Sequence, residues 1–232
     1  KIGFVAFLFV ILLVTAVLIV AEPHLSATLL VLTIGVVLMI VGGLAKKFIV
    51  GGAVIGAVGI VGFMISGAIS YVADRLTYWR DPWSDATGKG FQTIQSLLAI
   101  GSGGILGRGI GQSRQKYLWV PEPHNDFIFS IVCEELGLIG AVIIIILICL
   151  LVWRGFYVAM HAKDKFGSLL AIGLTFQVGL QAMLNIWVVT NTIPNTGISL
   201  PFFSYGGTSL LILLCEMGLV LSVSRGSDIE KT

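Results

Sequence analysis

Four carboxylates and a histidine gather in the segment VPEPHNDFIFSIVCEELG, residues 120–137, at the start of a strongly apolar run. They are Glu122, His124, Asp126, Glu134 and Glu135. A carboxylate within hydrogen-bond reach of a hydroxyl group can take its proton as a general base, and partial desolvation at a membrane edge raises the pKa of such an acid toward the working pH. The pattern therefore predicts proton transfer from a substrate held at a membrane surface.

Asp126 is the best candidate for this base, because it stands directly before the apolar run, where a lipid-borne substrate would present its headgroup. The structural alternative is an N-cap, in which Asp126 accepts backbone N–H bonds at the start of a helix. The two roles are compatible. Glu122 is interpreted as a solvated loop residue or a support for nearby cations, and His124 as a residue that orients the turn or tunes Asp126.

Two further acids follow inside the apolar run. If the run is one straight helix, Glu134 and Glu135 lie about 12 to 14 Å along it. Ionisable groups at that depth are expensive and normally face a polar cavity or a partner, so both are candidates for contact with the substrate path or for a role between helices. On a second loop, residues 190–203, Asn191 could hydrogen-bond a sugar or a peptide.

Three basic residues, Arg108, Arg114 and Lys116, precede the carboxylates. A planar guanidinium group matches two phosphate oxygens at once, so this cluster is typical of a site for an anionic headgroup, ideally a diphosphate. The alternative is a general attraction to acidic lipid. The sequence therefore places a candidate base and a candidate anion site in one region.

These residues must be positioned by membrane helices. Of the 232 residues, 56% are hydrophobic and only 11% are charged, whereas soluble domains have about 25% charged residues. Six runs are long enough to cross a hydrocarbon core of about 30 Å: residues 2–21, 25–45, 48–70, 127–153, 167–189 and 204–224. The sequence predicts an all-α polytopic membrane protein, with residues 1–232 in one membrane domain.

The basic residues of the short connections fall on one side of the membrane if the spans alternate, and that side is cytoplasmic. They are Lys46, Lys47, Arg154, Lys163, Lys165 and Arg225. The opposite short connections, residues 22–24 and 190–203, contain no Lys or Arg. This distribution predicts that both ends of the chain are cytoplasmic and that residues 71–126 form a large extracytoplasmic loop.

Within this loop, the stretch FQTIQSLLAIGSGGILGRGIG predicts a short helix at the membrane interface, followed by a glycine-rich turn. The expected apolar face carries Phe91, Ile94 and Leu98, and Gln95 and Ser96 fall outside that face. The glycine runs lack the Lys-Ser/Thr ending of a phosphate-binding P-loop, which argues against nucleotide binding. A formal net charge of +2 gives no support for a nucleic-acid partner.

Two long motifs carry a family resemblance. The runs GKGFQTIQSLLAIGSGGILGRGIGQSRQKYLWVPEPHNDFIFSIVCEELGLIG and IPNTGISLPFFSYGGTSLL closely resemble the SEDS proteins (shape, elongation, division and sporulation), the group of FtsW, RodA and SpoVE. The likeness extends from about Glu22 to Arg225. In short stretches such as GQSRQK, the chain resembles the division and sporulation branch more than the elongation branch.

The resemblance implies a bacterial inner-membrane protein of about ten spans, of which this chain is the C-terminal part. It implies polymerisation of lipid II into peptidoglycan glycan strands, a class B penicillin-binding protein as partner, contacts with other division or elongation machinery and with membrane lipids, and dependence on a divalent cation, Mg or Mn. The family's essential acid falls on Asp126. Pro123 and Asn125 replace the more usual Ala and Thr, and His24 and Ser26 replace an Asp and a Gly.

Two other classes of function compete with a glycosyltransferase. A transporter (flippase) for a lipid-linked cell-wall precursor would also carry charged residues in and near its spans, although no paired broken helices of the kind found in inverted repeats are visible. A scaffold for a penicillin-binding protein would need only helix packing. Loss of Asp126 would leave a scaffold unaffected if that packing survived.

Overall fold

The part of the chain that the structure describes is folded into helices and their connections. The structure is a computed structural model, and it describes residues 2–21, 25–45, 48, 51–52, 69–88, 90–115 and 125–227. The helices are α1 (Ile2–Ala21), α2 (Leu25–Val41), α4 (Ile69–Arg80), the 3-10 helix η2 (Pro82–Asp85), α5 (Phe91–Gly103), α6 (Ile128–Met160), α7 (Lys165–Val189) and α8 (Gly207–Gly226). No strand occurs in these residues, and the expected all-α fold is confirmed.

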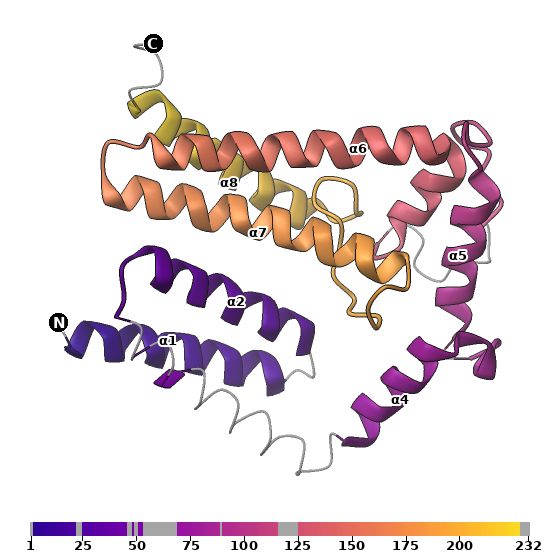
Figure 1. Ribbon diagram of the computed structural model, residues 1–232, viewed down its shortest axis with the longest axis horizontal. Coiled ribbons are helices and arrows are strands. Elements are labelled where there is room, and N and C mark those ends of the chain that lie inside the picture. The colour runs from indigo at the N-terminus through magenta and orange to yellow at the C-terminus, as the bar shows by residue number, and fades with distance from the viewer. Residues whose placement is uncertain are drawn as a thin grey trace.

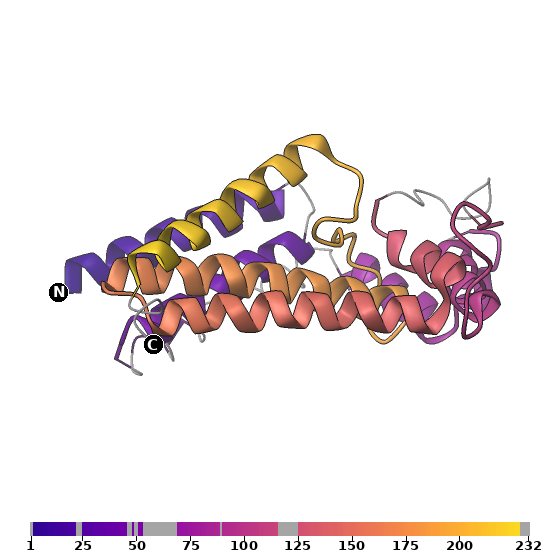
Figure 2. The same ribbon diagram turned by 90° about the horizontal axis from the view of Figure 1, so that it is seen from above.

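The long helices α6 and α7 run side by side in opposite directions, and α8 crosses both of them (Figures 1 and 2). Helices α1 and α2 form a second antiparallel pair, and α2 contacts α7. At one end of the bundle lie α4, α5 and the connections formed by residues 104–115 and 190–206, which together we call the loop end. Of the residues singled out in the sequence, Arg108, Arg114 and Asn191 lie there.

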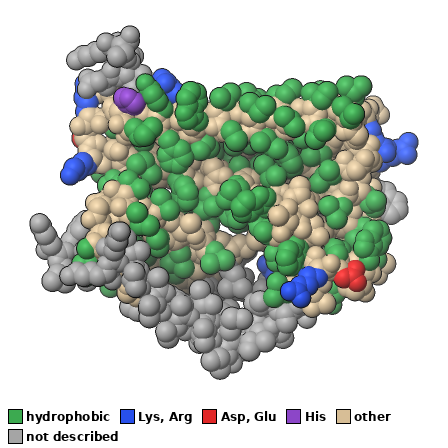
Figure 3. Space-filling view, viewed as in Figure 1, with side chains coloured by type: hydrophobic (Ala, Val, Ile, Leu, Met, Phe, Trp, Pro, Cys, Tyr) green, Lys and Arg blue, Asp and Glu red, His purple; other side chains and the backbone are tan. Residues whose placement is uncertain are grey.

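An apolar band lies between the two ends of the bundle. Figure 3 shows hydrophobic side chains covering much of the face formed by α6 and α7, with charged side chains toward its edges. Among the described residues, α6, α7 and α8 are long and apolar enough to cross a membrane, and shorter apolar helices cover Phe9–Ile19 and Ser26–Val41. The expected third span, residues 48–70, lies mostly outside the described residues.

Hydroxyl groups inside the apolar helices donate to their own backbone. Thr15 donates to the carbonyl oxygen of Ile11 at 2.8 Å, and Thr33 to that of Leu29 at 2.7 Å. Lipid offers no hydrogen-bond partner, so a hydroxyl within a span is satisfied most simply by the preceding turn of its own helix. These two threonines are therefore compatible with helices α1 and α2 in a membrane.

Helix α6 is bent at Gly137. This residue has φ 67° and ψ −168°, a backbone conformation that glycine tolerates and other residues resist. Residues 128–136, which we call the leading segment of α6, run across the loop end, and the helix changes direction after them (Figure 1). The expectation of one straight span beginning at residue 127 is therefore wrong. Glu134 and Glu135 precede the bend, so they lie on the leading segment that runs across the loop end and not at the membrane depth that a straight span would give them.

The short helix expected after residue 90 is confirmed as α5, but its buried face differs from the expected one. Ser96 is fully buried and donates to the carbonyl oxygen of Val189 at 2.9 Å, and Gln95 is also buried. Leu98, which was expected on the apolar face, is 47% exposed. The end of α7 supplies an unpaired backbone carbonyl at this contact, and a hydroxyl satisfies it where an alkyl group could not.

Candidate active site at the loop end

Asp126 lies in the turn that leads into α6. The N-cap of α6 is Phe127, so the alternative that made Asp126 the N-cap is wrong. The backbone around Asp126 is held by Asn185 of α7, which is fully buried and donates its side-chain N–H groups to the carbonyl oxygens of Asp126 and Ile198, each at 2.7 Å. One amide group thus joins the start of α6 to the loop of residues 190–203.

A hydroxyl group makes a second connection between the same two segments. Ser204 donates to the carbonyl oxygen of Asn125 at 2.7 Å and accepts a hydrogen bond from the backbone N–H of Leu200, also at 2.7 Å. Hydrogen bonds that are shielded from water are costly to break, because each group would be left without a partner. The backbone position of Asp126 is therefore fixed from two sides.

The Asp126 side chain is half-buried and lies beside Gly197. A Cβ atom placed at Gly197 would be 3.5 Å from Oδ2 of Asp126, and Gly197 has φ 67°, which disfavours any larger residue. Glycine at this position therefore places no side chain against the carboxylate.

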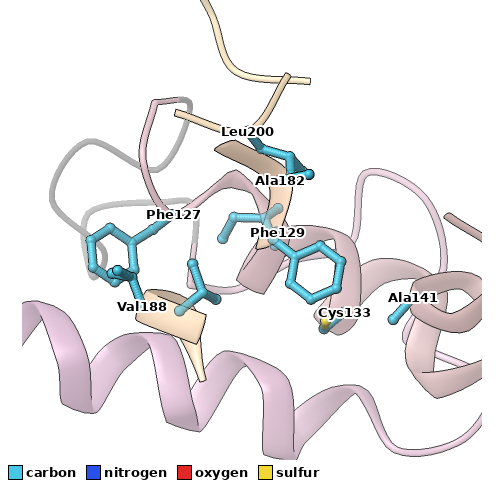
Figure 4. Close-up of a cluster of buried hydrophobic side chains, with 9 residues drawn as sticks. Phe127, Phe129, Cys133, Ala141, Ala182, Val188 and Leu200 are labelled. Carbon is cyan, nitrogen blue, oxygen red and sulfur yellow. The ribbon is translucent and has the colours of Figure 1, made fainter. Parts of the chain in front are cut away.

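A small apolar core supports this turn (Figure 4). Phe127 and Leu200 are each 1% exposed, and they belong to one cluster with Phe129, Val188 and Val189. The cluster joins the leading segment of α6 to the end of α7 and to the loop of residues 190–203. Burial of Phe127, directly after Asp126, and of Leu200 in the same cluster leaves this turn little freedom to move.

The loop of residues 190–203 is also held by hydrogen bonds to helix α4. Asn191 exchanges two hydrogen bonds with Trp79 of α4: the indole N–H donates to the Asn191 carbonyl oxygen at 3.1 Å, and the Asn191 amide donates to the Trp79 carbonyl oxygen at 3.3 Å. Arg75 donates to the carbonyl oxygen of Asn195 at 2.8 Å. The contact of Asn191 with substrate stays a prediction, and its present partner is Trp79.

Glu134 occupies a pocket made by its own chain. It is fully buried, and its carboxylate accepts hydrogen bonds from the Ser113 hydroxyl at 2.6 Å, the Arg114 backbone N–H at 3.1 Å and the Gln115 backbone N–H at 3.3 Å. Nε of Arg108 lies 3.7 Å from Oε1 of Glu134. A buried carboxylate needs this number of donors and a nearby cation to remain charged. Glu134 therefore organises residues 108–115.

The bend in α6 explains why this loop is held so closely. In a continuous helix, the N–H groups of Leu138 and Ile139 would bond the carbonyl oxygens of Glu134 and Glu135. Here those carbonyl oxygens accept from the N–H groups of Arg108 at 2.9 Å and Gly109 at 3.0 Å. The freed N–H groups donate instead to the carbonyl oxygens of Gly104 at 2.9 Å and Ile105 at 3.3 Å. The loop thus replaces two helical hydrogen bonds with four.

Glycine makes this close approach possible. A Cβ atom at Gly103 would collide with the carbonyl oxygen of Cys133, and one at Gly107 with that of Glu135. Gly107 also has φ 78°, so its backbone conformation favours glycine as well. The glycine-rich turn recognised in the sequence is therefore required by backbone contact with α6.

The structure brings some of the predicted site residues together and separates others. Arg108, Arg114 and Glu134 form one group, to which Glu135 is joined by a 3.4 Å hydrogen bond from the Ser113 backbone. Asp126 lies two residues before the start of α6, and Glu134 lies six residues into it, about 9 Å along the leading segment at 1.5 Å per residue. Lys116, Glu122 and His124 lie outside the described residues.

Sequence reasoning missed Asn185. An amide inside an apolar helix is expensive in a membrane unless it has partners, so its position near the end of α7 was the available indication. That position could not indicate which two carbonyl groups Asn185 binds, because they belong to residues 59 and 13 positions away in the chain.

A divalent cation remains a prediction. Within the described residues, no group of three or more His, Cys, Asp and Glu side chains could hold a metal ion. The carboxylate of Glu134 is already occupied by donors from its own chain, which makes it a poor metal ligand. The Asp126 carboxylate is a chemically suitable single ligand, and magnesium is often held by one or two carboxylates together with substrate phosphates.

Comparison with known proteins agrees with this architecture. The family described as cell cycle protein FTSW_RODA_SPOVE matches residues 2–229. Stage V sporulation protein E of Bacillus subtilis (strain 168) is 46% identical over 211 residues, which cover 90% of this chain and 57% of that protein. A probable peptidoglycan glycosyltransferase FtsW of Geobacter sp. (strain M18) is 42% identical over 222 residues, covering 96% of this chain and 60% of that protein.

Two solved structures are similar to the chain. One, described as showing structural coordination of polymerization and crosslinking by a peptidoglycan synthase complex, has a TM-score of 0.72 and 32% identity, covering 93% of this chain and 60% of that one. The other, the rod shape determining protein RodA of Thermus thermophilus, has a TM-score of 0.60 and 28% identity. The match covers 95% of this chain and 56% of that one. The chain thus spans less than two thirds of the length of these relatives. With a family match along almost its entire length, the chain belongs to the FtsW, RodA and SpoVE family of cell cycle proteins.

Proposed function

We propose that the protein containing this chain polymerises lipid II into peptidoglycan glycan strands at the outer face of the bacterial inner membrane. The observation that carries the proposal is the rigidly held turn of Asp126, whose half-buried side chain lies beside Gly197 at the loop end. Relatives named as probable peptidoglycan glycosyltransferases cover 96% of the chain, which supports the same reaction here.

In this reaction, a sugar hydroxyl of the acceptor attacks the anomeric carbon of the donor. The carboxylate of Asp126 takes the hydroxyl proton as the new C–O bond forms, and the bond between the anomeric carbon and the diphosphate breaks, so that the polyprenyl diphosphate leaves with the electron pair. General-base assistance of this kind is typically worth ~10² to 10⁴ in rate. A divalent cation, when bound, would neutralise charge on the departing diphosphate.

The protein's own contribution is orientation. Asn185 and Ser204 fix the backbone on both sides of Asp126, so the carboxylate does not have to be ordered when the substrate binds. A preorganised base saves the entropy of fixing its position at the moment of reaction. Gly197 leaves room for the sugar next to the carboxylate.

The orientation in the membrane is part of the proposal. Arg154, Lys163 and Arg225 lie at or beyond the ends of α6 and α8 that are remote from the loop end, which supports a cytoplasmic location for that side. The loop end would then face outward, where lipid-linked sugars are polymerised. Membrane-impermeant thiol labelling of single cysteines should modify Thr192→Cys from outside and Lys163→Cys from inside, and the opposite pattern would refute the orientation.

A class B penicillin-binding protein is the proposed partner, supported by the similar chain that belongs to a complex coordinating polymerization and crosslinking. An apolar groove of about 720 Å³ between α6 and α7, lined by Trp153, Phe156, Phe176 and Trp187 among others, could accept a transmembrane helix. Cys149 lines this groove and is exposed, and Cys215 is an exposed thiol on α8. Crosslinking to a cysteine in the partner's transmembrane helix should therefore occur at Cys149 and not at Cys215.

The deciding experiment is polymerisation of lipid II by the purified protein in vesicles, with and without the partner. Asp126→Asn should lower the rate of polymerisation by ~10² to 10⁴ while the protein stays folded, and Asp126→Glu should be less impaired. Polymerisation by the Asn variant at the normal rate would refute the catalytic role. If the unsubstituted protein translocates lipid II without polymerising it, the transporter is favoured. If it does neither, the scaffold is favoured.

A further inference from the structure

The loop of residues 104–115 combines apolar and cationic side chains at the outer edge of the bend in α6. Ile105 is 67% exposed, and Leu106 and Ile110 are each 80% exposed. They flank Arg108 in the sequence, and Ile105 is hydrogen-bonded through its backbone to Ile139, where α6 resumes after the bend. Contiguous exposed apolar side chains next to a membrane span are best explained by contact with lipid.

The two arginines of this loop carry N–H groups that could donate to a ligand. Nε of Arg108 is engaged by Glu134 and by the carbonyl oxygen of Ser102 at 3.3 Å, which fixes the position of the guanidinium group. Within the described residues, neither Nη group of Arg108 makes a recorded contact, and the exposed Arg114 side chain makes none either. A guanidinium that is held by one nitrogen and open at two others matches the paired oxygens of a phosphate.

The distance to the candidate base decides which diphosphate this loop can bind. In the proposed reaction, the donor's diphosphate is bonded directly to the carbon under attack, so it lies only a few bonds from the hydroxyl that Asp126 deprotonates. Glu134, which holds Arg108, lies six residues into α6, about 9 Å from its start at 1.5 Å per residue, and Asp126 precedes that start. The loop is therefore better placed for a diphosphate that lies some distance from the reacting hydroxyl than for the one that leaves. The acceptor's own diphosphate stays attached and lies beyond two sugar rings from its reacting hydroxyl.

Resting on the proposed function, we propose that residues 104–115 bind the lipid end of the acceptor: Arg108 and Arg114 hold its diphosphate, and Ile105, Leu106 and Ile110 contact its polyprenyl chain in the outer leaflet. Glu134 is a positioning residue, because it fixes Arg108 and the backbone of Arg114. Contact with the leaving diphosphate is the alternative role for the two arginines.

The test separates donor from acceptor in a single coupling step. The donor is a labelled lipid II analogue whose attacking hydroxyl is epimerised, so that it can donate but not accept. Ordinary lipid II is the acceptor at varied concentration, and only products that carry the label are counted, because ordinary lipid II also couples to itself. The full-length protein is reconstituted in phosphatidylcholine vesicles, with and without phosphatidylglycerol. The double variant Arg108→Gln with Arg114→Gln is compared with Arg80→Gln, which removes an exposed cation at the end of α4.

We expect the double variant to raise the KM for the acceptor about 10- to 100-fold, as loss of charge-assisted hydrogen bonds predicts, with kcat and the KM for the donor unchanged. Arg80→Gln should change none of these values. Arg114→Gln alone should raise the acceptor KM in the same direction, since this side chain supports no internal contact. The shift should persist in vesicles without phosphatidylglycerol.

Three results would overturn the inference. A raised donor KM or a lowered kcat, with an unchanged acceptor KM, would place the arginines on the leaving diphosphate. Equal shifts for donor and acceptor that vanish without phosphatidylglycerol would show attraction to bulk anionic lipid only. No change at all would remove the loop from substrate binding. If the unsubstituted protein couples nothing, the proposed function itself fails, which is a different outcome from any of these.

Discussion

The two ends of the leading segment of α6 use carboxylates in opposite ways. At its start, Asp126 has a backbone fixed by neighbouring segments and a half-buried side chain next to Gly197. At its end, Glu134 is fully buried and its carboxylate accepts three hydrogen bonds from residues 113–115. Both acids stand in the same short stretch of sequence. The two acids therefore differ in burial and surroundings: the Glu134 carboxylate is fully enclosed by its own loop, whereas that of Asp126 lies half-buried beside Gly197.

The largest effect should come from exchanging the two acids for their amides. Asp126→Asn should lower the rate of polymerisation by ~10² to 10⁴ and leave the thermal unfolding midpoint in detergent unchanged. Glu134→Gln should do the reverse, retaining measurable turnover and lowering the midpoint. Similar losses of activity and of stability in both variants would remove the contrast between the two ends.

Truncating the structural acid should release the loop. Glu134→Ala leaves the Ser113 hydroxyl, two backbone N–H groups and Arg108 without their partner, at a cost of about 3 to 5 kcal/mol for a broken buried pair. Trypsin should then cleave after Arg108 and Arg114 much faster than in the unsubstituted protein. Glu135→Ala is the matched comparison: this half-buried neighbour accepts a 3.4 Å hydrogen bond from the Ser113 backbone, so its loss should raise the cleavage rate much less than loss of Glu134.

A smaller effect is expected where the backbone of Asp126 is held. Asn185→Ala removes both hydrogen bonds to the carbonyl oxygens of Asp126 and Ile198, which should cost about 1 to 3 kcal/mol and lower kcat more than it changes KM. Thr175→Val is the control on the same helix, since the buried Thr175 hydroxyl has no recorded partner among the described residues. An unchanged kcat in the Asn185 variant would show that the turn is held by its apolar neighbours alone.

The smallest effect is expected at an acid far from the loop end. Glu216 of α8 accepts hydrogen bonds from the Gln177 amide of α7 at 3.1 and 3.4 Å. Polar pairs between helices within a membrane are worth about 0.6 kcal/mol on average. A double-mutant cycle with Gln177→Leu and Glu216→Leu should give a coupling of that size and normal polymerisation. A coupling of several kcal/mol would show that this pair, too, is a major structural site.

Much of the fold could be predicted from the sequence. Helices α6, α7 and α8 follow from long apolar runs, because a segment in lipid must satisfy its own backbone hydrogen bonds. Helix α5 and the glycine-rich turn follow from a short amphipathic stretch that ends in glycines. Asp126 could be selected as the candidate base because it lies in a motif that resembles those of the family.

The bend at Gly137 could not be predicted in the same way. Glycines are common in transmembrane helices, and most of them leave the helix intact. This one opens the helix because residues 104–109, about thirty positions earlier, supply the donors and acceptors that replace its lost hydrogen bonds. The buried Ser96 of α5 was missed for a similar reason, since its partner is a carbonyl group at the end of α7.

The sequence by itself determined where helices form and which residues carry charge, since both depend on side chains that are close together in the chain. Only the tertiary structure decided that Glu134 serves the fold, that Asp126 is held by Asn185, and that Arg108 is held by Glu134. Hydrogen bonds between distant segments depend on which backbone groups are left unpaired after folding, and local sequence does not specify them.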